Sequence, residues 1–237
     1  MMLRHLSTLL LASVIAVTAA SAKVTEKFSQ TYPLAAAGEV SLGNMNGDVE
    51  IVAWDKPEVA VEAEKSAKDE QALKRIEIVV EADNDRIAIK TKHHRDTESS
   101  WWNRGRQTGS VRYTIRVPAE LASLKVEVMN SNVTTERVRG DVKIATMNGR
   151  VRATGLTGDT TVNTMNGRIY ASFDRVGSGQ KLSFDSMNGS CEVELPADAS
   201  AHVVAGTMNG RVSCELPITV EKSRRRSLRG HIGKGEA

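Results

Sequence analysis

Two aspartates come nearest to a catalytic pair in this sequence. Asp141 and Asp159 each follow a glycine, at equivalent positions of an internal repeat. If neighbouring repeats stack, the two carboxylates lie about 5 Å apart, a separation at which carboxylate pairs hydrolyse glycosides or bind calcium. Aspartate beside glycine is also a common turn residue. We favour the turn and keep a polysaccharide-active enzyme as a rival interpretation.

A polar loop carries the other residues that suggest chemistry. Trp101, Trp102 and Arg104 have the composition of an aromatic anchor for a glycan or a protein partner. The plainer alternative is a disordered loop whose tryptophans fold back onto a sheet. His93 and His94 precede them, but adjacent histidines without a spaced third ligand make a poor metal site. With no Gly-x-Ser-x-Gly or phosphate-loop motif either, we predict no enzyme, no metal and no cofactor.

These residues are embedded in a repeat of the tripeptide Met-Asn-Gly. When the copies are aligned on the asparagine, positions four and six before it and three and five after it are mostly apolar, with polar residues between. This period-two alternation predicts a strand on each side of an Asn-Gly corner. A second corner follows at Gly140 and Gly158. The corner asparagines are Asn46, Asn130, Asn148, Asn166, Asn188 and Asn209.

Two all-β architectures fit the repeat. In a β-solenoid of 18–22-residue coils, equivalent positions stack into continuous ladders. In an antiparallel meander, Asn-Gly is a tight hairpin turn. We predict the solenoid, because a meander gives no reason for every repeat to resemble the next. We expect the corner asparagines to adopt left-handed backbone and to bond amide to amide along the stack; a polar ligand-binding row is the alternative.

The residues beside the corners supply the candidate surface. Each methionine before a corner asparagine forms either an outward, soft apolar strip or ordinary packing. Arg152, Arg168 and Arg211 are expected on the outer faces of the coils, where they contact a glycan or an envelope protein.

We divide the chain into four segments: a signal peptide at 1–22, the first coil with an antiparallel β insertion or cap at 23–117, β-repeat coils at 118–220, and a basic tail at 221–237. Within the insertion we expect a strand near Val59, a short helix from Asp69 to Arg75 capped by Ser66, and three further strands. The tail is expected to be a solvated loop.

The N-terminal segment predicts export. A basic start is followed by an apolar run from Leu9 to Val17 and by the small-x-small site Ala20-Ser21-Ala22. No later segment is apolar enough for a membrane helix. We therefore expect the mature protein in the periplasm or at the cell surface. A net charge of +3 gives no case for nucleic acid.

Two cysteines in an exported protein raise the question of a disulfide. In stacked coils, Cys191 and Cys214 are offset by one coil and two residues. Their Cα atoms then lie roughly 8 Å apart, beyond the usual limit of about 7 Å. We predict two buried thiols.

Several motifs resemble a known family. The segment 43–51 (Gly-Asn-Met-Asn-Gly-Asp-Val-Glu-Ile), the following Trp54-Asp55 and the run of Asn-Gly coils resemble the DUF4097-type β-strand-repeat proteins, which are described as candidate adhesins and are related to head-GIN auto-transporter adhesin domains. The resemblance covers nearly all of the mature chain. It implies a β-helix-like fold at the cell envelope and brings no catalytic or binding residues with it.

The C-terminus departs from that pattern. Similar proteins add another strand after a Gly-Ile-Gly-x-Gly segment, whereas this chain stops soon after Gly230. We expect an exposed terminal coil to promote self-association. The leading functional prediction is a non-enzymatic, exported, adhesin-like or scaffold module. Its alternatives are a periplasmic stress or signalling component that binds a membrane partner, and the polysaccharide-active enzyme.

Overall fold

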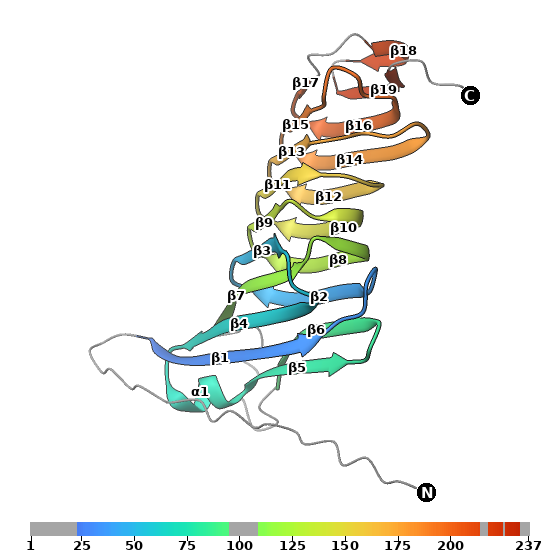
Figure 1. Ribbon diagram of the computed structural model, residues 1–237. Coiled ribbons are helices and arrows are strands. Elements are labelled where there is room, and N and C mark those ends of the chain that lie inside the picture. Colours follow the sequence, from blue (N-terminus) through green and yellow to red (C-terminus); the bar gives the residue numbers. More distant parts are fainter. Residues whose placement is uncertain (1–22, 95–108, 214–217, 225, 233–237) are drawn as a thin grey trace, which may run out of the picture.

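The computed structural model describes residues 23–94, 109–213, 218–224 and 226–232. It confirms the all-β prediction, with one short helix among the described residues. The elements stand one above another in a tall stack with a broader base (Figure 1). The base elements are β1 (Val24–Pro33), β4 (Glu58–Ala67), α1 (Glu70–Lys74), β5 (Ile76–Ala82), β6 (Arg86–His93) and β7 (Gly109–Pro118).

The stack itself is made of strand pairs that flank the corners. Each pair contributes one strand to each of two sheets. The strands before the corners are β2 (Glu39–Asn46), β8 (Glu120–Asn130), β10 (Arg139–Asn148), β12 (Thr160–Asn166), β14 (Gln180–Asn188) and β16 (Ala201–Asn209). The strands after them are β3 (Val49–Trp54), β9 (Val133–Glu136), β11 (Val151–Leu156), β13 (Ile169–Phe173), β15 (Cys191–Glu194) and β17 (Val212–Ser213).

Successive repeats pair in parallel and in register. β10 pairs with β12 so that Asn148 lies opposite Asn166, and β12 pairs with β14 so that Asn166 lies opposite Asn188. The strands after the corners do the same, with Val151 opposite Ile169. Stacked coils require this pairing, whereas neighbouring strands of a meander run in opposite directions.

The first copy of the repeat joins the stack despite the insertion that follows it. β2 pairs in parallel with β8, which places Asn46 opposite Asn130, and β3 pairs with β9. Residues between β3 and β8 therefore leave the stack and return to it. This arrangement keeps one unbroken register of corners from Asn46 to Asn209.

The apolar columns seen in the sequence form one core between the two sheets. Four residues before each corner asparagine lie Leu42, Val126, Ile144, Val162, Phe184 and Ala205, all buried. The columns six before and three and five after are also buried wherever the structure describes them, except that Val212 is only partly covered. Because aromatic residues are few, this core consists mainly of aliphatic side chains.

The base contains the expected helix and strands, with two differences. The helix begins at Glu70, but its N-cap is Asp69 rather than Ser66: Asp69 Oδ1 accepts a hydrogen bond of 2.7 Å from the Ala72 N–H. The strand β1 was not anticipated. It pairs antiparallel with β4, and β4 with β7, while β5 pairs antiparallel with β6. β6 and β7 then join the stack through parallel pairs with β2 and β3.

The C-terminal end differs from the expected solvated tail. β18 (Ile218–Arg224) and β19 (Ser227–Ile232) form an antiparallel pair, and β19 also pairs antiparallel with β16. This hairpin covers the last strand of one sheet, so the tail's basic residues sit partly in strands. The strand pattern here is weak because charged residues interrupt the apolar alternation.

Cys191 is a buried free thiol, and burial raises its pKa to about 11. It lies opposite Val212 in register. Cys214 lies outside the described residues, so the prediction that it too is a buried, unpaired thiol stays a prediction.

Candidate binding edge

The corner asparagines form a ladder of side-chain hydrogen bonds along one edge of the stack. Each Nδ2 donates to the Oδ1 of the asparagine one coil earlier. Asn148 donates to Asn130 at 2.8 Å and Asn166 to Asn148 at 2.7 Å. The ladder crosses the insertion, because Asn130 donates to Asn46 at 2.9 Å. It continues through Asn188 to Asn209. The predicted amide stacking is therefore confirmed.

Asn130 is followed by Ser131, and each of the other corner asparagines is followed by a glycine that lies close to a backbone carbonyl group. A Cβ added at Gly167 would lie 1.8 Å from the carbonyl oxygen of Gly149, and one at Gly189 would lie 1.8 Å from that of Gly167. No side chain fits at such a distance. The Gly167 N–H donates to the Asn188 carbonyl at 3.1 Å, which extends the backbone ladder around the corner.

The expected left-handed conformation of the corner asparagines is wrong. In the described part of the chain, the non-glycine residues with positive φ are Ala37 and Arg137. The corner asparagines end their strands in extended backbone and serve the ladder through their amides. The left-handed conformation was expected because Asn-Gly is a common turn sequence. The role of these asparagines in amide hydrogen bonding was indicated by the repeat alone.

Small hydroxyl side chains brace the corners from inside. Two residues before the corner asparagine, Thr146, Ser186 and Thr207 are buried. The Thr207 hydroxyl donates to the Gly189 carbonyl at 2.9 Å, and the Ser186 hydroxyl to the Gly167 carbonyl at 3.0 Å. These bonds satisfy carbonyl groups at the Ser186 and Thr207 corners, and Thr146 makes the equivalent bond to Ser131, whereas the Thr164 hydroxyl has no such partner.

The methionine before each asparagine lies on the outside of the edge. The residues directly before and after each methionine are paired in register with their equivalents on the neighbouring strands. The methionines therefore form one row across adjacent strands. Met45, at the base, is half-buried. The exposed fractions of the others are 37% for Met129, 40% for Met147, 42% for Met165, 42% for Met187 and 61% for Met208.

Exposed arginines lie on the other side of the corner. Arg150, Arg168 and Arg211 each stand two residues after a corner asparagine, and none of them has an ion pair with another described residue. Their guanidinium groups are free to meet an anion. Arg168 and Arg211 were predicted for this surface, whereas Arg150 was missed; its alignment with the other two was the available signal. Arg152 is exposed but lies over the Tyr170 ring, 4.5 Å from its centroid.

Asp159 lies in the short link before β12, whereas Asp141 lies near the start of β10. Asp159 Oδ1 accepts a hydrogen bond of 2.9 Å from the Lys181 N–H of the next coil. Gly140 and Gly158 both have positive φ, at 125° and 112°, as the predicted corner requires. The register of β10 and β12 begins with Val142 opposite Thr160, the residues that follow Asp141 and Asp159.

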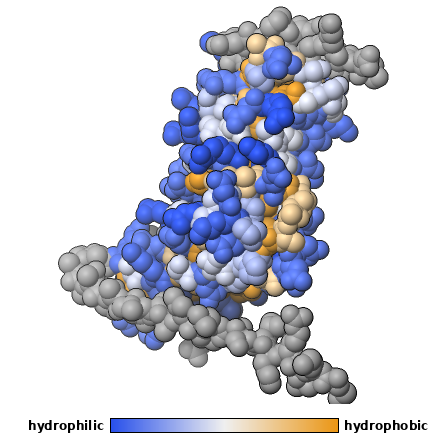
Figure 2. All heavy atoms as spheres, viewed as in Figure 1, coloured by the Kyte–Doolittle hydropathy of each residue, from blue (hydrophilic) through white to orange (hydrophobic). Residues whose placement is uncertain are grey.

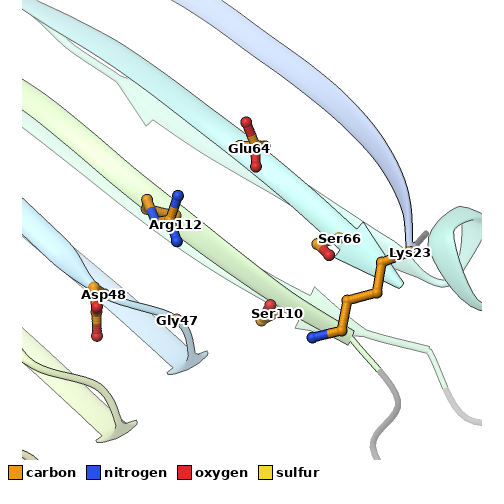
Figure 3. Close-up of a pocket in the computed structure, with 7 residues that line it drawn as sticks. All are labelled: Lys23, Gly47, Asp48, Glu64, Ser66, Ser110 and Arg112. Atoms are coloured by element: carbon orange, nitrogen blue, oxygen red, sulfur yellow. The ribbon is translucent and has the colours of Figure 1, made fainter. Parts of the chain in front are cut away.

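A hollow of about 320 Å³ lies where the edge meets the base. Figure 3 shows Arg112 on β7 between Glu64 on β4 and Asp48 beside the first corner, with Lys23 at the far end. Charges of both signs face the hollow and offset one another. It therefore selects neither an anion nor a cation as strongly as the arginines of the edge do.

The two histidines do not act together. His94 Nε2 lies 2.7 Å from Glu77 Oε2 at the surface, whereas burial lowers the pKa of His93. Among the residues that the structure describes, no group of three or more His, Cys, Asp or Glu side chains is placed to hold a metal ion. Trp101, Trp102 and Arg104 lie outside the described residues, so their role as an anchor stays a prediction. In the same described ranges, no helix has the length and apolar character needed to cross a membrane.

Several solved structures are similar to this chain at low sequence identity. A candidate cell adhesion protein from Clostridium sporogenes shares 9% identity, with 81% of this chain and 100% of that chain covered, at a TM-score of 0.45. A candidate adhesin from Bacteroides fragilis shares 14% identity, with coverages of 81% and 91%, at a TM-score of 0.40. One from Parabacteroides distasonis shares 14%, with coverages of 79% and 77%, at a TM-score of 0.36.

A search of curated proteins finds no match to this chain. A family model does match. The model described as Toastrack DUF4097 covers residues 108–237, which include every corner except the first. That segment is more than half of the 237 residues, and the protein therefore belongs to the Toastrack DUF4097 family.

Proposed function

We propose that the protein is an exported, non-enzymatic binding module of the cell envelope, built as a β-solenoid, which holds an acidic glycan along its Asn-Gly edge in the manner of an adhesin or scaffold. The observation that carries this proposal is the set of arginines at equivalent positions of the edge, Arg150, Arg168 and Arg211, none of which forms an ion pair within the described part of the chain. Like charges spaced one coil apart (Arg150 and Arg168) and two coils apart (Arg168 and Arg211) favour a repeating anion.

The edge suits a polymer better than a small ligand. Equivalent residues on adjacent coils are about 4.8 Å apart, so the arginines follow one line parallel to the stack. Each exposed contact is weak, but contacts on one rigid scaffold combine as linked sites. The asparagine ladder and the buried hydroxyls supply that rigidity. Most of the surface seen in Figure 2 is hydrophilic, as expected for a surface that meets a hydrated partner.

The experiment measures binding of the purified protein to polygalacturonate, an acidic glycan, and to dextran, a neutral one. The wild-type protein is expected to bind polygalacturonate, and more weakly as salt rises. Replacing Arg150, Arg168 and Arg211 by glutamine is expected to raise Kd by about threefold to 150-fold, since each exposed charge contact contributes about 0.2–1 kcal/mol.

The matched control changes three arginines near the second corner, Arg137, Arg139 and Arg175, to glutamine. It lowers the net charge equally, and we expect Kd to stay within about twofold of the wild type. An equal loss in both variants, or absence of wild-type binding to the acidic glycan, contradicts the proposal. Protease treatment of intact cells that express the tagged full chain then tests location: digestion indicates the surface, and protection until the outer membrane is opened indicates the periplasm. Protection until the cytoplasm itself is opened contradicts export.

A further inference from the structure

The exposed large apolar side chains are of one chemical kind. Among the described residues, those with large exposed fractions are all methionines, and all belong to the row beside the corner asparagines. An isolated exposed apolar residue needs no explanation, but a continuous row of them does. The row therefore has a function that its exposure serves.

The row is constant in type, whereas the buried columns are not. The column four residues before the asparagine contains Leu, Val, Ile, Phe and Ala in successive coils. The methionine position contains Met in all six coils. An apolar strip can be built from leucine or isoleucine equally well, so constancy of methionine points to its sulfur. A thioether is a neutral, soft ligand that selects Cu(I) among the common metal ions.

The spacing of the coils suits a metal ion held between sulfurs. Neighbouring strands lie about 4.7–4.9 Å apart. A metal–sulfur bond is on the order of 2.3 Å, as in zinc sites, so an ion midway between two sulfurs separates them by about 4.6 Å. Methionine has three rotatable side-chain bonds, which let sulfurs from adjacent coils converge on one ion.

The electrostatic surroundings single out one coil. Asp185 lies two residues before Met187 and faces outward on the same strand, and it has no ion pair with another described residue. The equivalent acid beside Met129 is Glu127, which is neutralised by Lys125 at 2.8 Å. The arginine position across the corner is also interrupted here, because Ser190 stands between Arg168 and Arg211. Of the four coils whose corners are Asn148, Asn166, Asn188 and Asn209, this one presents the least positive surroundings to a cation.

We propose that Met187, together with Met165 and Met208 on the adjacent coils, forms a site that binds Cu(I) through thioether sulfur, with the Asp185 carboxylate balancing the charge. The site uses a different face of the edge from the arginines. The proposed Cu(I) site does not depend on glycan binding at the arginines. No ligand has to lose a proton, because thioethers are neutral in water.

The experiment titrates Cu(I) into the purified full-chain protein in competition with the chromogenic chelator bathocuproine disulfonate. The variant Met165→Leu/Met187→Leu/Met208→Leu removes three sulfurs and keeps the apolar volume. We expect the Kd for Cu(I) to rise at least tenfold in this variant. In parallel, Ag(I), which resembles Cu(I) without its redox chemistry, is added to protein labelled with ¹³C at the methionine methyl groups. The signals of Met165, Met187 and Met208 are expected to shift.

The matched control is Met45→Leu/Met129→Leu/Met147→Leu, which removes the same number of sulfurs from the other end of the row and should leave Kd within about threefold. Cys191, Cys214 and both histidines are present in every variant, so any binding at those groups is common to all. Unchanged Kd in the first variant overturns the proposal, as does an equal rise in both variants. Urea unfolding checks that the variants fold; if one does not, the Ag(I) shifts in the wild-type protein decide, and their absence from the three methionines overturns the site.

Discussion

The two corners of each coil are built on different principles. At the Asn-Gly corner, amides bond from coil to coil and each glycine lies against the carbonyl group of the coil before it. At the second corner Gly140 and Gly158 also lie against carbonyl groups of the preceding coil, but no such side-chain ladder is present among the described residues. The link from β11 to β12 spans residues 157–159, whereas the links from β13 to β14 and from β15 to β16 span 174–179 and 195–200.

This difference explains why the repeat length varies from 18 to 22 residues while the corner motif does not. All the added residues fall at the second corner, in links that are mostly exposed but each bury one apolar side chain, Val176 and Ala199. The cost of lengthening a surface loop is small, about 0.6 kcal/mol per doubling of its length. An added residue at the Asn-Gly corner would disrupt both the side-chain amide ladder and the backbone hydrogen bonds around the corner. A binding site is better positioned on the Asn-Gly corner, because the amide ladder and the glycine contacts both fix its geometry.

The largest contrast is expected from an insertion. Gly-Ser-Gly placed between Asn166 and Gly167 breaks the amide ladder and the backbone contacts of two coils, and is expected to lower the free energy of unfolding by more than about 4 kcal/mol. The same insertion after Ser178, in the longer loop of the second corner, should cost less than about 1 kcal/mol. Urea unfolding followed by circular dichroism measures both. Equal losses of stability from the two insertions would show that the two corners do not differ in rigidity.

The sequence predicted the strands and corners of the repeat better than it predicted the close backbone contacts between coils. The apolar columns, the corner positions and the amide ladder follow from the repeat, because stacking makes equivalent residues neighbours. The close approach at Gly167 could not be predicted, since glycine in a turn is usually explained by its backbone freedom. β1 was missed because it lies outside the repeat and its exposed residues alternate only weakly.

The candidate surface was predicted in part. Arg168 and Arg211 were identified from their place in the repeat, but exposure and pairing depend on side-chain contacts that no spacing reveals. Arg152 stacks on Tyr170 for that reason. The methionine row left two interpretations open at the sequence level, and only the exposed fractions decide that the row lies outward.

The second prediction isolates the backbone contact from the ladder. Gly167→Ala places a Cβ 1.8 Å from the Gly149 carbonyl oxygen, so strands β12 and β13 must shift. We expect the free energy of unfolding to fall by about 3 kcal/mol, the upper end of ordinary overpacking costs. The control is Gly177→Ala in the second-corner loop, where the nearest atom to the new Cβ is Gln180 Oε1 at 4.0 Å. There the change should stay within about 0.5 kcal/mol. A cost at Gly167 as small as that at Gly177 shows that the corner is not tightly packed.

The third prediction measures the ladder alone. Asn166→Ala removes two hydrogen bonds, the one donated to Asn148 at 2.7 Å and the one accepted from Asn188 at 2.8 Å. Each bond contributes about 0.5–1.5 kcal/mol net, and exposure places these at the lower end. We expect a loss of about 1 to 2 kcal/mol in urea unfolding.

Position along the ladder should set the size of the effect. Asn209, in the last coil, donates a single ladder bond to Asn188, so Asn209→Ala is expected to cost about half as much as Asn166→Ala. Asn163→Ala, on the outer face of the same strand as Asn166, removes an exposed amide outside the ladder and should change stability by less than about 0.5 kcal/mol. If all three variants lose the same stability, the ladder adds nothing beyond general strand propensity, and the stack depends on its glycine contacts and its core alone.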